Sequence, residues 1–574
     1  MKKNKFIYIL SALVLAGATS CEDTLTEKPD SYYEKENYFV NETNANMAIV
    51  GIYDCLAKLQ HYGQNEMAIP SSDDTYYIQG TGTDNTRRDI SHYMLSPSNT
   101  WITTCWKWKY TGIDRANYAI DGIENMEGYA DSKRLKSYAA EARFLRALLS
   151  LDLVKYWGDV PYKTMYSASY EDAYQPRMDR EKIYDQIIKD LNFAKDNMDW
   201  ATASSTPERA TQGAARALLM RAYLQRAGYS LQMNGNMTRP DDEARKKYFE
   251  AVTKEWEAFV ANGYHDFYAD GYAELFKGFS AGKLDTKESL FEIAFFNVSG
   301  DPEDSGNWGT YNGPQVEAPG AGADMSQVMG RANAFFRVVP EWKGFFEDND
   351  ARRDIMVCTY QYKWDKATLN HKKAEQKSGK NWYPGKWRRE WMPLGFKNPN
   401  NVDVNYCFLR YADVVLMAAE AYNELNDPAT AWSLINKVRA RAGATQIDGT
   451  NYADFYKAPK VYDLEELDNA GTPTGSLFID DSTPQGQVRT ALYWERGFEL
   501  AFEGQRKYDL IRWNVLFPAL KLFGQKTIAD INPKTAKDLY PAYKNFKPGK
   551  HELLPIPQDE MDINSKLTEQ NPGY

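Results

Sequence analysis

Apolar residues recur at intervals of three and four along much of the chain, which is the spacing of one face of an α-helix. In residues 135–157 these positions are Leu135, Ala139, Ala142, Leu145, Leu149 and Leu153. Gly158 and Pro161 follow and are expected to end the helix. Similar patterns predict helices over residues 180–198, 211–229, 248–264, 408–425 and 428–443. A last helical stretch over 487–513 is expected to break near Gly504.

Helices of this length, joined by short turns, are typical of tetratricopeptide-like helical hairpins. Four other stretches are rich in Gly, Pro, Asn, Asp and aromatic residues, namely 63–105, 297–340, 359–407 and 444–485. A helical scaffold that carries long loops is a common way to build a binding face. The sequence therefore predicts a mainly α protein with a loop-rich, irregular half that binds ligand.

The N-terminus has the organisation of an export signal. Three lysines within residues 2–5 precede an apolar run over 6–18, which is shorter than the ~20 residues needed to span a bilayer. Small residues then lead into Cys21, a pattern similar to the bacterial lipobox. We interpret 1–20 as a lipoprotein signal peptide and Cys21 as the lipidated residue. The alternative is an ordinary signal peptide followed by a chance cysteine.

Composition narrows the classes of partner. Without residues 1–20 the chain has 66 basic and 79 acidic side chains, a net charge of −13, which argues against nucleic acid as a partner. The other four cysteines lie far apart without CxxC spacing, so we expect buried thiols rather than a zinc site, with one disulfide still possible. No EF-hand-like spacing indicates calcium, and no motif predicts another metal or cofactor.

Several segments, in order along nearly the whole chain, resemble the SusD/RagB family of surface nutrient-binding lipoproteins. They are "WKWKYTGIDRANYAID" (106–121), "AEARFLRALLSLDLVKYWGDVPY" (140–162), "RATQGAARALLMRAYLQRAG" (209–228), "FLRYADVVLMAAEAYNEL" (408–425), "INKVRARAG" (435–443), "ERGFELAFEGQRKYDLIRW" (495–513) and "LLPIPQDEMDINSKLTEQNPGY" (553–574). The resemblance implies one SusD-like domain over 21–574. About four tetratricopeptide-like helix pairs would lie mainly within 106–265 and 408–443, with binding loops in 63–105 and 297–407.

The same resemblance implies a function. Family members are non-catalytic, and they capture glycans or oligosaccharides and pass them to a SusC-like TonB-dependent outer-membrane barrel. Some members bind peptides, so a peptide-binding lipoprotein of the same fold is an alternative. We expect an outer-membrane protein anchored through Cys21. Glu22 and Asp23 resemble the acidic signal that directs some lipoproteins to the cell exterior.

An enzyme is the remaining alternative. Glu495, Glu499 and Glu503 recur every four residues, so their carboxylates share one helical face. A glycosidase needs two carboxylates about 5–10 Å apart. Arginines lie in the same segment, and a structural ion-pair network explains this pattern better than a catalytic site.

The binding candidates lie in the loops. Family members commonly present an aromatic side chain near residue 101, with polar neighbours. We therefore expect Trp101 to be a platform for a sugar ring, with Asp73, Asp74, Arg88 and Asn99 as partners of its hydroxyl groups.

Tyrosine and tryptophan offer a flat apolar face and a polar tip, which suits a pyranose ring. In the glycine-rich stretch "GNWGTYNGPQ" (306–315), Trp308 and Tyr311 would be free to stack on such a ring. Tyr76 and Tyr77 are further candidates. The alternative for all four is that their rings fold back onto the body of the protein.

Overall fold

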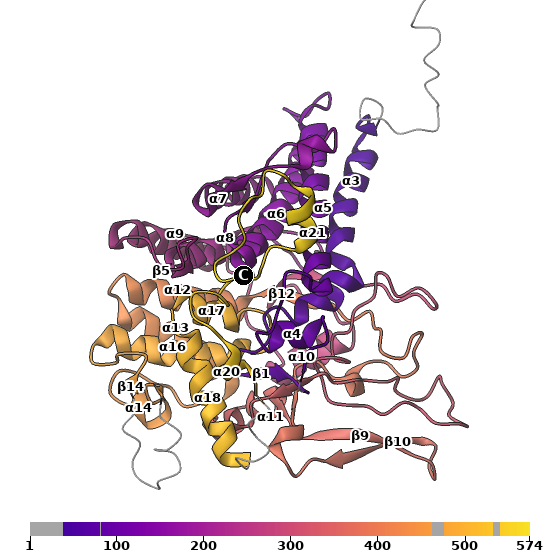
Figure 1. Ribbon diagram of the computed structural model, residues 1–574, viewed down its shortest axis with the longest axis vertical. Coiled ribbons are helices and arrows are strands. Elements are labelled where there is room, and N and C mark those ends of the chain that lie inside the picture. The colour runs from indigo at the N-terminus through magenta and orange to yellow at the C-terminus, as the bar shows by residue number, and fades with distance from the viewer. Residues whose placement is uncertain (1–37, 81, 462–475, 532–539) are drawn as a thin grey trace, which may run out of the picture.

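The computed structural model describes residues 38–80, 82–461, 476–531 and 540–574 (Figure 1). The predicted signal peptide over 1–20 and the predicted lipidation site Cys21 lie outside these residues. The longer helices are α3 (Glu42–Ala57), α5 (Thr100–Glu124), α6 (Lys133–Trp157), α7 (Arg180–Asn197), α8 (Gln212–Ala227), α9 (Asp242–Asn262), α10 (Tyr272–Ser280), α12 (Tyr411–Glu424), α13 (Pro428–Ala442), α16 (Pro484–Leu500) and α18 (Leu516–Ile531). None of the described helices is both long and apolar enough to cross a membrane.

The long helices begin at polar capping residues. Ser132 caps α6 by accepting a hydrogen bond from the backbone N–H of Leu135 at 3.1 Å. Thr211 caps α8 in the same way, accepting from Ala214 at 3.3 Å. Gly158 follows α6 with a φ of 74°, which glycine adopts without the steric penalty of a side chain. The predicted ends of these two helices are confirmed to within two residues.

Successive helices pack side by side as hairpins. Helix α5 contacts α6, α6 contacts α7, α7 contacts α8, and α8 contacts α9. Helix α9 then contacts α12, which packs against α13 and α16. In Figure 1, α5 to α9 fill the upper half and α12, α13 and α16 lie below α9. The mainly α fold with tetratricopeptide-like hairpins is confirmed.

The sheets among the described residues have two strands each. Their strands are β1 (Tyr76–Ile78) with β7 (Phe336–Val338), β2 (Val160–Pro161) with β3 (Arg177–Met178), β4 (Ser230–Leu231) with β5 (Met237–Thr238), β6 (Ser289–Ile293) with β12 (Tyr406–Arg410), β8 (Val357–Cys358) with β11 (Tyr383–Pro384), β9 (Tyr360–Asp365) with β10 (Asn370–Glu375), and β13 (Lys460–Val461) with β14 (Ser476–Leu477). The β9–β10 hairpin projects from the loop-rich part at the lower right of Figure 1.

One predicted helix is wrong at its start. Residues 408–410 belong to strand β12, and α12 begins only at Tyr411. Arg410 has extended backbone angles, and β12 pairs with β6 with Tyr406 opposite Ile293. The predicted break near Gly504 is confirmed, because α16 ends at Leu500 and α17 (Arg506–Arg512) follows.

The remaining elements are short helical turns. They are η2 (Leu59–Gly63), η3 (Asn65–Met67), α4 (Arg87–Ser91), η4 (Glu171–Ala173), η5 (Pro340–Phe345), α11 (Arg353–Met356), η6 (Gly379–Asn381), η7 (Arg389–Trp391), α14 (Tyr452–Phe455), α20 (Ala542–Asn545) and α21 (Gln558–Ile563). Most lie in or beside the stretches expected to be loops, which are irregular as predicted. That residues 21–574 form one domain stays a prediction.

The four cysteines of the described residues are buried free thiols: Cys55, Cys105, Cys358 and Cys407. They serve as small core residues, as expected from their spacing. Within the described part of the chain, no group of three or more His, Cys, Asp or Glu side chains is arranged so that it could hold a metal ion.

Candidate functional site

Strand pairing brings two distant loops together on the loop-rich side. Strand β1 pairs antiparallel with β7, and Ile78 lies opposite Phe336. The backbone N–H of Gln79 continues the pairing by donating to the carbonyl oxygen of Phe335 at 3.0 Å. The loop that follows β1 therefore lies beside the residue that precedes β7.

Hydrogen bonds of Asn99 connect the same loop to the first turn of α5. The side chain of Asn99 accepts from the backbone N–H of Trp101 at 3.1 Å and donates to the carbonyl oxygen of Thr86 at 2.9 Å. The hydroxyl of Thr100 donates to the carbonyl oxygen of Asn85 at 3.2 Å. Trp101 and the residues around position 86 are thus held as neighbours.

A cluster of aromatic and cationic side chains forms where these segments meet. The guanidinium of Arg87 lies 3.9 Å from the ring centre of Phe335, and the Phe335 ring contacts Tyr311 edge to face with centroids 4.4 Å apart. Trp101, Tyr311 and Phe335 are half-buried and pack against the main core. Arg88 is half-buried beside Arg87 in sequence. Side-chain contacts join Arg87, Phe335 and Tyr311, and the hydrogen bonds of Asn99 and Thr100 hold the backbone at Trp101 close to Arg87 and Arg88. We call these five residues the Arg87 patch.

The Arg87 patch also carries hydrogen-bond donors. Nε of Arg87 is buried and has no hydrogen-bond partner among the described residues, while Nε of Arg88 donates to the Asp84 carboxylate at 3.1 Å. Burial raises the pKa of Tyr311, so its phenol stays protonated at neutral pH. Half-buried rings beside fixed donors can hold a ring that has an apolar face and hydroxyl groups at its edge.

Three of the nine predicted ligand-binding residues lie in this patch: Trp101, Tyr311 and Arg88. Their contact with ligand stays a prediction. Arg87 and Phe335 were not predicted. Arg87 could have been predicted from the sequence, because it is adjacent to the predicted Arg88. Phe335 could not, because only the pairing of β1 with β7 brings it to the patch.

The predicted exposure of three other aromatic residues is wrong. Trp308 is 3% exposed, and its ring stacks on Tyr406 with centroids 4.1 Å apart and an angle of 5°. Its indole N–H donates to the carbonyl oxygen of Tyr62 at 3.0 Å. Tyr76 and Tyr77 are buried within strand β1. These rings lie in the core and offer no free face to a ligand in this structure.

Three of the four predicted polar partners are also buried, each with a structural role. Asp74 accepts two hydrogen bonds from Arg506, at 2.8 and 2.6 Å. Asp73 accepts from the backbone N–H of Thr75 at 2.7 Å, and burial together with the neighbouring Asp74 raises its pKa to about 7. Asn99 is fully buried as the cap of α5. The expectation that these three side chains are exposed to a ligand is therefore wrong.

The regularly spaced carboxylates of α16 and the turn after it are buried and paired with arginines. Glu495 accepts from Arg352 at 2.8 Å, and Glu499 accepts from Arg410 at 2.6 Å. Glu503 accepts from Nε of the same Arg410 at 2.6 Å. Glu495 and Glu499 are fully buried, and Glu503 is 5% exposed.

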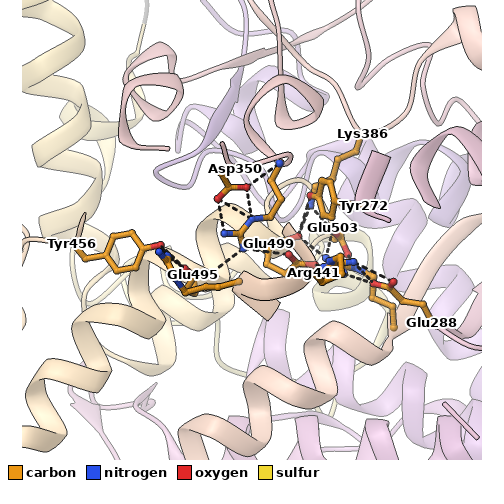
Figure 2. Close-up of polar contacts among 12 residues, drawn as sticks. Tyr272, Glu288, Asp350, Lys386, Arg441, Tyr456, Glu495, Glu499 and Glu503 are labelled. Atoms are coloured by element: carbon orange, nitrogen blue, oxygen red, sulfur yellow. Dashed lines mark hydrogen bonds and ion pairs between the residues drawn. The ribbon is translucent and has the colours of Figure 1, made fainter. Parts of the chain in front are cut away.

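These contacts belong to one larger ion-pair network, which Figure 2 shows running from Glu495 beside Tyr456 to Glu288 beside Arg441. We call it the Glu499 network. Its charged members are six carboxylates and five cations, namely Glu288, Glu347, Asp350, Glu495, Glu499, Glu503, Arg352, Lys386, Arg410, Arg439 and Arg441. They come from α13, α16, β12 and the loop-rich half, so the network joins the helical scaffold to the loops.

The arginines around Glu499 keep its carboxyl group ionised. Burial alone would raise its pKa, but the guanidinium groups of Arg441, Arg410 and Arg352 lower the pKa from 4.5 to about 2. A carboxylate whose pKa is depressed in the folded state stabilises that state above its unfolded pKa, and this contribution is lost as the pH falls.

We therefore expect the difference in unfolding free energy between the wild type and Glu499→Gln to be constant from pH 7 to about pH 5. It should narrow as the pH falls from 4.5 towards 2, because protonation then removes the same charge as the substitution. Urea denaturation of both proteins at several pH values measures the difference. A difference that stays the same between pH 5 and pH 3 would contradict the ionised state of Glu499.

Comparison with known proteins gives matches along almost the whole chain. A family model described as "SusD family" matches residues 287–574, and another described as "Starch-binding associating with outer membrane" matches residues 23–224. SusD-like protein P25 of Formosa agariphila is 26% identical, in an alignment that covers 100% of this chain and 99% of the relative.

Two solved structures have folds similar to that of this chain. A SusD homologue from Bacteroides thetaiotaomicron has a TM-score of 0.76 and 28% identity, covering 94% of this chain and 98% of that one. Surface glycan-binding protein A from the same organism, solved with laminarihexaose, has a TM-score of 0.63 and 19% identity. The match covers 92% of this chain and 99% of that protein, and it concerns the fold alone.

Proposed function

This chain belongs to the SusD/RagB family, and from this membership we propose that it captures a glycan or oligosaccharide at the cell surface. It then delivers the ligand to a SusC-like TonB-dependent outer-membrane transporter. The protein acts by binding and does not cleave its ligand. A fold shared with a protein solved in complex with laminarihexaose supports a glycan as the ligand class.

The Arg87 patch is the observation that carries the proposal for this chain. Trp101, Tyr311 and Phe335 supply half-buried rings, and the half-buried guanidinium groups of Arg87 and Arg88 supply hydrogen-bond donors. Stacking on aromatic rings combined with donors to hydroxyl groups is suited to sugars. Moderate affinity is enough, because captured ligand must later be released to the transporter.

The Glu499 network supports a role without catalysis. A glycosidase needs one carboxyl group to protonate the leaving oxygen and a second to act as nucleophile or base, both in contact with substrate. Glu495, Glu499 and Glu503 are buried and bonded to arginines instead. The alternative that this cluster is catalytic therefore has no support from the geometry.

The proposal also includes a lipid anchor at Cys21 and a position beside the transporter. Cys21 would carry the lipid and hold the protein at the outer membrane, facing the cell exterior. The description of the second family model, which names association with the outer membrane, agrees with this location. A tether raises the local concentration of the binding protein near the mouth of the transporter.

We expect Trp101→Ala and Arg87→Ala each to weaken glycan binding about tenfold, because each removes a contact worth roughly 1–1.5 kcal/mol. Native affinity electrophoresis of residues 22–574 in gels that contain laminarin or other plant, host and microbial polysaccharides measures retardation. Trp200→Ala is the matched control, since Trp200 is also half-buried but packs on Phe259 and His265 in the helical scaffold.

The control should retain wild-type retardation. Equal retardation of the wild type and both patch variants would exclude the Arg87 patch as the site. Retardation by none of the polysaccharides would favour the peptide-binding alternative.

A further inference from the structure

A large cavity lined by described residues lies apart from the Arg87 patch. It has a volume of ≈ 850 Å³ and lies between the end of α10, the segment around β6 and residues 389–405. A neighbouring cavity of ≈ 470 Å³ shares Glu208, Glu292, Phe295 and Phe296 with it. No residue of the Arg87 patch lines either cavity.

Four exposed apolar side chains lie on the rim of the larger cavity, which Lys283, Arg389 and Lys397 also line. Phe296, Leu394, Leu284 and Met325 line it, and their exposed fractions range from 49% to 65%. Exposed apolar side chains that gather at one hollow mark an interaction site. Leucine and methionine offer no flat face to a sugar ring, so this rim suits an apolar group better than a glycan.

The floor shared by the two cavities is acidic. Asn405 donates from one side-chain nitrogen to Glu208 at 2.9 Å and to Glu292 at 3.0 Å, so the two carboxylates lie close together. Glu292 is 2% exposed, and its Oε1 has no hydrogen-bond partner among the described residues. Neither carboxylate forms an ion pair within that part of the chain.

Glu292 differs from the carboxylates of the Glu499 network, because no cation pairs with it among the described residues. Buried carboxylates are normally paired with cations, as in the Glu499 network. Burial, helped by the nearby Glu208 and Asp285 and opposed by hydrogen bonds from Ser289 and Asn405, raises the pKa of Glu292 to about 7. A cation placed at Oε1 would supply the missing partner.

We propose that this cavity binds an organic cation that carries an apolar body. Its ammonium or guanidinium group lies between Glu208 and Glu292, and its apolar part lies against Phe296, Leu394 and Met325. Such a group occurs in a basic side chain flanked by apolar residues, and also in an amino sugar. The apolar rim favours the first source. The site is separate from glycan capture and is independent of it.

The test uses fluorescence-labelled acetyl-Leu-Lys-Phe-amide, the matched peptide acetyl-Leu-Gln-Phe-amide, and a glucosamine trimer, titrated with residues 22–574. We expect the lysine peptide to bind at least about tenfold more tightly than the glutamine peptide. We also expect it to bind more tightly than the glucosamine trimer. Its affinity should rise between pH 6 and pH 8, because the cation binds ionised Glu292.

Glu292→Gln should remove this preference for lysine, and Glu208→Gln provides a second variant at a more exposed position in case the first does not fold. Glu243→Gln on the surface of α9 is the control and should change nothing. Glycan should still retard Glu292→Gln as it retards the wild type. The experiment therefore distinguishes a failure of this proposal from a failure of the proposed function. Equal binding of the two peptides, tighter binding of the glucosamine trimer, or no binding at millimolar concentration would overturn the proposal.

Discussion

Replacing Glu499 with glutamine is expected to lower the free energy of unfolding by about 3–5 kcal/mol, because removing one partner leaves buried charges uncompensated. Glu499 is fully buried and contacts Arg352, Arg410 and Arg441. After the substitution, Arg352, Arg410 and Arg441 each lose one carboxylate partner. The loss of stability should extend beyond α16, because the network joins α13 and β12 to the loop-rich half.

Urea denaturation followed by circular dichroism measures this change. Glu243→Gln is the matched control, because Glu243 is exposed on α9 and pairs only with an exposed Lys247 at 2.8 Å among the described residues. The control should change stability by less than about 0.5 kcal/mol. A loss in Glu499→Gln as small as that of the control would mean that the network contributes little to the fold.

Replacing Trp308 with alanine is expected to have a similarly large effect on stability, about 3–5 kcal/mol, and no effect on the glycan affinity of the folded protein. The ring of Trp308 stacks on Tyr406 and contacts Trp387 at 5.0 Å, while its N–H donates to Tyr62. Alanine would leave a cavity in the core and an unpaired carbonyl oxygen at residue 62.

Thermal unfolding and affinity electrophoresis of the same samples separate the two effects. Trp101→Ala is the comparison, since Trp101 is half-buried at the Arg87 patch. We expect it to weaken retardation more than stability, which is the reverse of Trp308→Ala. If Trp308→Ala abolished retardation while retaining the wild-type melting temperature, its ring would have to reach ligand in another conformation.

The helical half could be predicted because each helix has a one-sided apolar pattern between recognisable end signals. Thr211 before α8 and Gly158 after α6 are such signals. Strand β12 could not be predicted in the same way. Its five residues are all buried, so its apolar run continues into that of α12 without a change of period.

The candidate site was only partly predictable. Composition singled out the loops around Arg88 and Tyr311, and the family resemblance pointed to Trp101. Arg87, the neighbour of Arg88, lies over the Phe335 ring, which contacts Tyr311. Composition could not distinguish exposed aromatic residues from buried ones. Trp308 lies in a glycine-rich loop, yet it is buried because Tyr406 and Tyr62 supply its contacts from distant segments.

The central claim is capture of a glycan without cleavage. It is tested most directly by titrating residues 22–574 with the polysaccharide that retards the protein in gels, while new reducing ends are assayed in the same solution for several hours. The account predicts saturable binding and no increase in reducing ends. Binding accompanied by a steady release of reducing ends would contradict it.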